Sequence, residues 1–190
     1  MQPPERLYYT GDEEADRLLA TDPLALLVGF TLDQQVPLQK AFSGPLELRR
    51  RIGPYDAARL AAMDPGELEA AFRARPALHR FPAAMARRVQ EVAAAIVRDY
   101  EGRPEQIWAG AQDGRDLERR LRSLPGFGEM KASTILAVLA RRFDVQLPGI
   151  ESVLPDHPTL GDVDSYEARD RYQAGKRAHK AALRAAAASG

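Results

Sequence analysis

Proline and glycine interrupt this chain at intervals that leave stretches of about ten to fifteen residues between them. Alanine and leucine dominate these stretches, and the alternation of β-branched and polar residues that is typical of half-buried strands is almost absent. Alanine and leucine have high helix propensity, and the intervals suit helices of three to four turns. The sequence therefore predicts an all-α fold, and 190 residues suffice for one core.

Two prolines fix the ends of the first predicted helix. Asp22 followed by Pro23 is typical of an N-cap with proline in the first turn, and an apolar segment follows as far as Leu32. Pro37 cannot donate a backbone hydrogen bond within a helix, so this helix should end near Gln34-Gln35 and a new one should begin at Pro37. The two glutamines are therefore expected at a junction between helices.

The same signals predict the remaining helices. Asp64-Pro65-Gly66-Glu67 resembles a capped N-terminus, and residues 83–100 form an amphipathic helix with Val97 on its buried side. Further helices are expected over 116–124, 132–143 and 166–188, whereas the Pro- and Gly-containing segment 144–165 should be rich in loops.

Composition excludes several classes of function. Cysteine is absent, which excludes disulfides, thiolate catalysis and iron–sulfur clusters. No apolar segment is long enough to span a membrane, and no secretory signal is visible after Met1, so we expect a cytoplasmic, nucleoid-associated protein. The formal net charge is zero, but acidic and basic segments alternate along the chain, so a basic face for nucleic acid can still form.

The pentapeptide Leu124-Pro125-Gly126-Phe127-Gly128 lies between two predicted helices. Proline ends the first helix, and the glycines allow a tight turn without side chains to block a ligand. The first amides of the next helix are then unpaired at the positive end of its dipole, which is the geometry that binds phosphate. Lys131 adds positive charge nearby. An ordinary turn between helices explains the same residues, so the pentapeptide alone leaves both readings open.

Residues 124–132, Leu-Pro-Gly-Phe-Gly-Glu-Met-Lys-Ala, resemble the hairpin of the helix-hairpin-helix DNA glycosylase superfamily, which includes endonuclease III and 3-methyladenine glycosylase II. Leu32-Asp33-Gln34-Gln35-Val36 is similar to a segment on the second helix of these enzymes. The segment from His79 to Val89 is similar to a third segment of the same enzymes, which lies between the other two in the chain. The three matches follow the family's order over residues 24–150.

This resemblance implies a base excision repair protein that binds double-stranded DNA and flips a damaged base into a cleft. It implies one unit over 1–190, with a helical barrel lobe at 37–140, its hairpin at 116–143, and a second lobe formed by 1–36 and 144–190. The hairpin residues Leu124, Gly126, Phe127, Gly128 and Lys131 would bind a phosphate, and the backbone of Leu124 and Gly126 could hold a monovalent cation. Gln35, with Gln34 beside it, would fill the gap left by the flipped base, although glutamines that face solvent at a helix end remain the alternative.

The family's catalytic residues are not where the resemblance places them. Relatives that cleave the strand carry a nucleophilic lysine at the position of Met130, and Lys131 follows it by one residue. One residue turns a helix by about 100°, so we expect Lys131 to face elsewhere and the protein to lack lyase activity. The family's aspartate would fall within Pro148-Gly149-Ile150, which contains no acid. Glu151, if the loop shifts, and Asp33, beside the glutamines, are the remaining candidates.

Three outcomes follow for the chemistry: a monofunctional DNA N-glycosylase with an unusual acid, a glycosylase that relies on a labile base, or a noncatalytic DNA-binding protein. A further alternative is a helical protein-interaction domain that does not bind DNA and in which the glycine hairpin is only a turn. The monofunctional glycosylase, acting as a monomer without a redox cofactor, is the function that we expect from the sequence.

Overall fold

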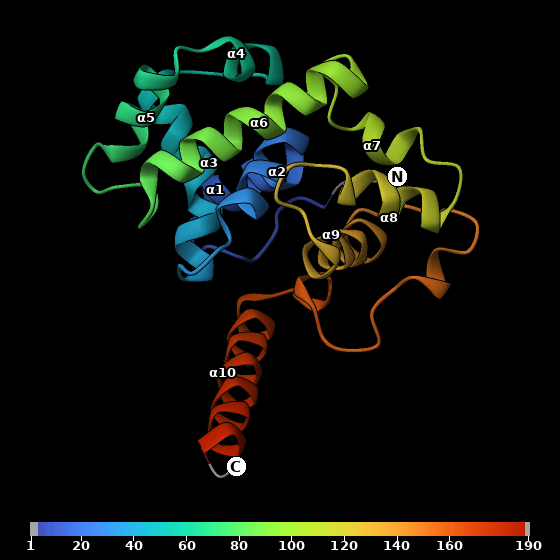
Figure 1. Ribbon diagram of the computed structural model, residues 1–190. Coiled ribbons are helices and arrows are strands. Elements are labelled where there is room, and N and C mark those ends of the chain that lie inside the picture. The colour runs from blue at the N-terminus through green and yellow to red at the C-terminus, as the bar shows by residue number, and fades with distance from the viewer. Residues whose placement is uncertain (1–3, 189–190) are drawn as a thin grey trace.

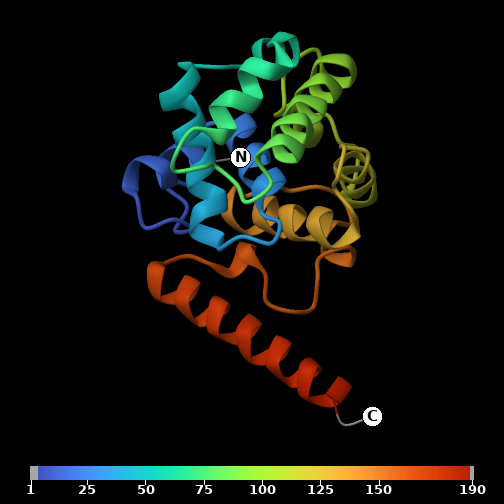
Figure 2. The same cartoon turned by 60° about the vertical axis from the view of Figure 1, so that its left-hand side comes forward.

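The computed structural model describes residues 4–188, and these residues contain ten α-helices and no strand. The all-α prediction is therefore confirmed. Nine of the helices, with two short 3-10 turns, surround one core, and the tenth projects from it (Figures 1 and 2). No helix among these residues is long and apolar enough to cross a membrane.

The first half of the chain supplies six helices. They are α1 (Glu13–Thr21), α2 (Pro23–Leu32), α3 (Leu38–Ile52), α4 (Ala57–Ala62), α5 (Pro65–Arg73) and α6 (Pro82–Tyr100). The predicted caps are confirmed at Asp22, whose side chain accepts from two amides of α2, and at Asp64, which accepts from the Glu67 amide. Pro37 is the N-cap of α3, so the two glutamines do lie at a helix junction.

The second half supplies the hairpin and the projecting helix. It contains α7 (Gln106–Ala109), α8 (Gly114–Arg122), α9 (Glu129–Arg142), the 3-10 turns η1 (Ile150–Ser152) and η2 (Leu160–Asp162), and α10 (Tyr166–Ala188). Helix α9 begins three residues earlier than predicted, directly after the glycine turn. Segment 144–165 contains only the two short turns, as expected of a loop-rich region.

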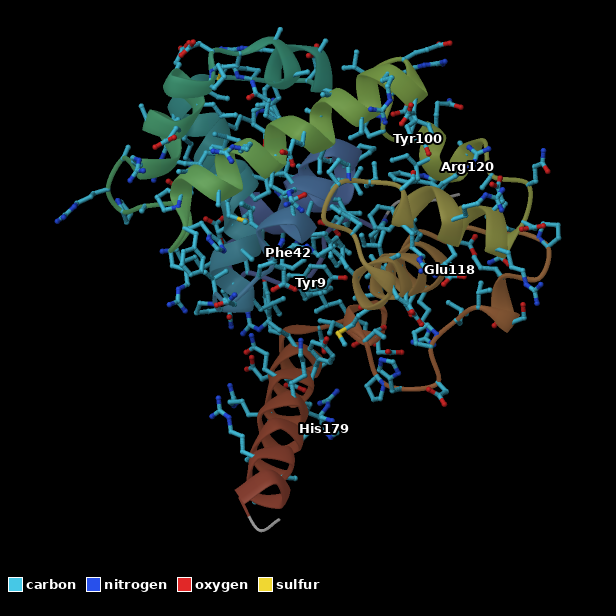
Figure 3. All side chains as sticks on the ribbon, viewed as in Figure 1. Tyr9, Phe42, Tyr100, Glu118, Arg120 and His179 are labelled. Atoms are coloured by element: carbon cyan, nitrogen blue, oxygen red, sulfur yellow. The ribbon has the colours of Figure 1, made fainter. Side chains whose placement is uncertain are left out.

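The core is built around α2, which is buried at almost every position. Phe42 of α3 lies edge-on to both Phe30 and Tyr9, with ring centroids 5.0 Å apart in each pair, and Figure 3 shows Tyr9 and Phe42 together at the centre of the molecule. Helix α6 buries Val89, Val92 and Ile96, as its pattern predicts. The prediction for Val97 is wrong: it is 37% exposed, because the buried face of α6 extends toward Ala95, on the side of the helix opposite Val97.

Candidate nucleic-acid interface and pocket

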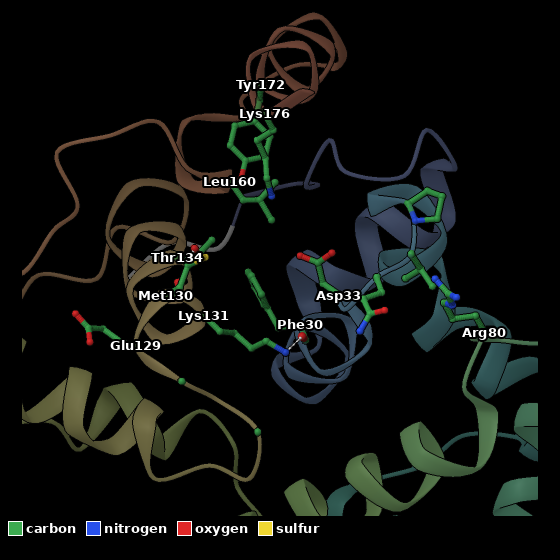
Figure 4. Close-up of a pocket in the computed structure, with 15 residues that line it drawn as sticks. Phe30, Asp33, Arg80, Glu129, Met130, Lys131, Thr134, Leu160, Tyr172 and Lys176 are labelled. Carbon is green, nitrogen blue, oxygen red and sulfur yellow. Dashed lines mark hydrogen bonds between the residues drawn. The ribbon is translucent and has the colours of Figure 1, made fainter. Parts of the chain in front are cut away.

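A pocket of about 870 Å³ lies where the C-terminal end of α2, the N-terminal end of α9 and one face of α10 meet (Figure 4). Its size is within the range usual for ligand sites in proteins. The side chains that matter for its chemistry come from segments far apart in the sequence. They are Asp33, Gln35, Arg80, Lys131, Tyr172 and Lys176.

Asp33 is the C-cap of α2 and projects into the pocket (Figure 4). Burial raises the pKa of its carboxyl above the ordinary value, and the charges of Lys176 and Lys131 act in the opposite direction. A partly buried carboxylate whose pKa is affected by two nearby cations is an arrangement typical of functional sites. Asp33, one of the two acids considered from the sequence, therefore lies where chemistry on a bound ligand could occur.

Glu151 lies elsewhere. It belongs to η1, where its side chain is exposed, and it does not line the pocket. The loop around it is fixed against α8, because the Gly114 amide donates to the Pro148 carbonyl at 3.0 Å and a Cβ on Gly114 would approach the Ile150 Cα to 2.6 Å. Asp33 lines the pocket and Glu151 does not, so the structure does not bring the two candidate acids together in this site.

Lys131 enters the pocket, whereas its neighbour Met130 is 81% exposed at the rim. The Lys131 Nζ donates to the Phe30 carbonyl at 2.5 Å and lies 5.1 Å from the centre of the Phe127 ring. Desolvation lowers the pKa of Lys131 to about 8, while the Asp33 carboxylate acts to raise it. Both residues line the pocket, but they point in different directions, as the turn of about 100° between neighbouring helix residues requires, and Lys131 points toward α2. Whether this position can support lyase chemistry stays a prediction.

In the glycine turn between α8 and α9, Gly126 is covered by the side chain of Arg88, whereas Gly128 faces open space. Gly126 has a φ of +78°, and a Cβ there would collide with the guanidinium of Arg88, which extends from α6 over the turn. Gly128 is the N-cap of α9, without a side-chain cap, and a Cβ on it would meet nothing within 4 Å. Leu124 and Phe127 are buried and anchor the turn. The amides that begin α9 thus face open space beside the pocket.

Other basic residues near the turn are already paired. Asp116 accepts from Arg119 at 2.5 Å and from Arg120 at 3.0 Å, and Arg122 lies 4.0 Å from Glu118. Arg88, which covers the turn, also lies 3.1 Å from the Glu91 carboxylate, so the positive charge without a carboxylate partner at the turn comes from Lys131. A contact between Arg88 and the hairpin was not predicted from the sequence, because Arg88 is one of three arginines on the amphipathic helix α6 and only the fold brings it to the turn.

The glutamine junction forms another side of the pocket. Gln35 has a φ of +56°, a left-handed conformation that few residues other than glycine adopt, and its exposed side chain lines the pocket. The Gln34 side chain instead donates to the Thr31 carbonyl at 3.1 Å, closing the end of α2. Of the two glutamines, only Gln35 is placed to touch a ligand.

His79 holds this junction to the loop that precedes α6. Its Nε2 lies 2.8 Å from the Gln34 carbonyl, and its Nδ1 accepts from the Phe81 amide at 3.0 Å. These roles require the neutral tautomer protonated at Nε2, and burial lowers the pKa of the ring accordingly. The ring thereby ties Gln35 on one side of the pocket to Arg80 on the other.

A bound cation at the hairpin stays a prediction. The Leu124 carbonyl accepts from the Phe127 amide at 3.1 Å, which leaves one of its two lone pairs for a ligand. Side chains do not supply an alternative, because no three His, Asp or Glu residues within 4–188 cluster in a way that could hold a metal.

Lys131→Met should make the protein more stable at neutral pH. The folded-state pKa of about 8 lies below the ordinary 10.5, so at pH 7 the folded protein carries the full cost of a partly buried ammonium. The unfolded chain binds more protons between these two values, so the stability of the wild type rises as pH increases through this window. We expect the substitution to add about 1 kcal/mol at pH 7.

Thermal unfolding at two pH values tests this expectation. The melting temperature of Lys131→Met should exceed that of the wild type by roughly 2–4 °C at pH 7, and the difference should shrink at pH 10. A variant that melts lower than the wild type at pH 7 would mean that the bond to Phe30 outweighs the cost of burial.

Comparison of the chain with protein-family models, with curated proteins and with solved structures finds no match.

Proposed function

We propose that this protein is a base excision DNA repair protein, a monofunctional DNA N-glycosylase with a helix-hairpin-helix motif formed by α8 and α9. The observation that carries the proposal is the convergence of Asp33 and Lys131 in one pocket directly beside the open N-terminus of α9. The first amides of α9 would bind a phosphate of double-stranded DNA, and the damaged base would be flipped into the pocket. Gln35 would occupy the gap in the duplex.

The chemistry follows from the two charged groups. The N-glycosidic bond breaks with its electron pair leaving on the base, and positive charge develops on the sugar, where the Asp33 carboxylate stabilises it. Water then adds to C1′, and its proton passes to Asp33. The Lys131 ammonium is placed to donate a hydrogen bond to the departing base. These steps need no redox cofactor.

We also propose that the protein lacks lyase activity. Met130 stands at the position where the resembling enzymes carry their nucleophilic lysine, and the Nζ of Lys131, one residue further on, donates to the Phe30 carbonyl. Schiff-base chemistry needs a free amine placed to attack the aldehyde of the abasic sugar. Excision should therefore produce intact abasic strands.

The test is a panel of duplexes that carry uracil, hypoxanthine, an alkylated purine or an oxidised base. The purified monomer should release at least one of these bases, as seen when alkali converts the abasic site to a strand break. Without alkali the strand should remain intact, and borohydride should trap no adduct on an abasic duplex at pH 7. Absence of product on every duplex would overturn the glycosylase proposal, and a Lys131-dependent adduct would overturn its monofunctional part.

The second candidate is a noncatalytic DNA-binding protein. The observation that favours it is the fixed loop around Ile150, which carries no acid where the related enzymes would place one and is packed against α8. This candidate predicts duplex binding with a steep salt dependence and no base release. A protein-interaction domain predicts no binding to any duplex at low salt.

A further inference from the structure

Helix α10 is attached to the body through its N-terminal half. Tyr166 donates to the buried Asp16 at 3.1 Å, Ala168 is buried, and Gln173 exchanges two amide hydrogen bonds with Gln39 of α3, at 3.2 and 3.0 Å. Beyond Gln173, every side chain that the structure describes is exposed. The C-terminal half therefore extends away from the core as an arm, on which Figure 3 labels His179 (Figures 1–3).

The charge on this arm has one sign. After Asp170 the chain contains no further acid, although the whole protein has a net charge of zero. Lys176, Arg177 and Arg184 form no ion pair with a carboxylate of the described residues. A neutral protein has thus gathered cations without an ion-pair partner on an element that packs against little of its own surface, which favours a polyanionic partner.

The cations begin at the pocket and follow the helix outward. Tyr172 and Lys176 line the pocket, so this side of α10 faces the proposed DNA site. With about 100° between successive residues, Arg177 and Arg184 lie on the half of the helix surface that contains Gln173 and Lys176. Arg171 lies on the opposite half and is also exposed. The arm therefore has a cationic side and, within the same helix, an arginine that faces away from it.

We propose that the arm of α10 binds the phosphate backbone of the same duplex, next to the site of base flipping. This inference rests on the proposed function and adds a second contact region to it. From Lys176 to Arg184 the helix rises about 12 Å, which corresponds to roughly three to four base-pair steps along the duplex axis. Contacts of this kind are independent of sequence, so they contribute affinity and salt dependence rather than choice of lesion.

The test compares the wild type with Arg177→Ala/Arg184→Ala and with Arg171→Ala as the matched control. Alanine has the highest helix propensity, so circular dichroism should show that both variants keep α10. Binding of a labelled 30-base-pair duplex is measured by fluorescence anisotropy over a series of salt concentrations. The double variant should bind about tenfold more weakly at low salt, and its slope of log affinity against log salt should be shallower by about two. Arg171→Ala should match the wild type.

Each outcome separates the arm from the catalytic proposal. If the double variant keeps the affinity and slope of the wild type while base release proceeds, the arm proposal is overturned and the glycosylase stands. If the slope changes but no duplex in the panel loses a base, the arm contact stands and the glycosylase fails. If Arg171→Ala lowers affinity as much as the double variant, the effect is one of overall charge, and the directed contact is overturned. A wild type that ignores every duplex overturns both proposals.

Discussion

Asp33→Asn should leave the protein folded and able to bind DNA, but reduce base release by roughly 100-fold or more. Asparagine keeps the size of the side chain, so the C-terminal end of α2 and the pocket should remain intact. It removes the negative charge that would stabilise the developing cation on the sugar, and it cannot take a proton from water. Single-turnover cleavage on whichever duplex the panel identifies measures the effect, and anisotropy measures binding.

Glu151→Gln is the matched control, since it neutralises the other acid considered from the sequence. Glu151 is exposed and does not line the pocket, so this variant should release base at the rate of the wild type. The reverse result, with Glu151→Gln inactive and Asp33→Asn active, would show that the loop rearranges on DNA and that Asp33 is not the catalytic acid.

The pH dependence of the rate of base release tests the roles of Asp33 and Lys131 independently. The rate should rise as Asp33 ionises, at a pH above the ordinary range of an aspartate because burial raises its pKa. It should fall again above about pH 8 as Lys131 loses its proton. The decrease in rate above about pH 8 should be absent in Lys131→Met, because methionine has no proton to lose at this position.

Gly128→Val should weaken duplex binding by about tenfold or more without lowering the melting temperature. Gly128 has φ −77° and ψ 178°, which valine adopts readily, and a Cβ at this position meets no atom within 4 Å. The folded protein therefore has room for the new side chain. The added methyl groups would occupy the open space in front of the first amides of α9, where the proposal places a phosphate.

A series at the two glycines makes this prediction specific. Gly128→Ala should produce a smaller loss of affinity than Gly128→Val, also at unchanged stability. Gly126→Val should instead destabilise the fold, because a side chain is strained at the positive φ of this residue and Arg88 would have to move aside. If Gly128→Val binds DNA as well as the wild type, the amides of α9 are not the phosphate site.

Local signals were enough to predict most helices. An N-cap such as Asp22 acts on the amides two or three residues away, and Pro37 acts on the turn before it, so their consequences can be derived from a short segment. The predicted start of α9 at residue 132 was late because apolar periodicity detects the first buried residue, Ala132, rather than the exposed first turn. The short helices α4 and α7 carry too few residues for a periodic pattern.

The pocket depends on long-range packing that no local pattern encodes. The sequence identified Asp33 and the glutamines as neighbours at a helix end, and it identified the glycine turn. It could not show that α9 is oriented so that the Nζ of Lys131 reaches the Phe30 carbonyl at the end of α2, because that orientation is set by the contact of α9 with the rest of the core. Lys176 reaches the same pocket from the other end of the chain, across a separation that no local pattern spans.

His79 has a consequence for how the mouth of the pocket moves. Its ring bridges two segments that are 45 residues apart, with the Gln34 carbonyl on one side and, on the other, the Phe81 amide. A ligand that pushes Gln35 aside must therefore stretch or carry along the turn that bears Arg80. The segments that carry Gln35 and Arg80 should therefore move together as one rigid unit. Acidification would place a second proton on the ring, at Nδ1, which could then no longer accept from the Phe81 amide, and the two segments would move independently.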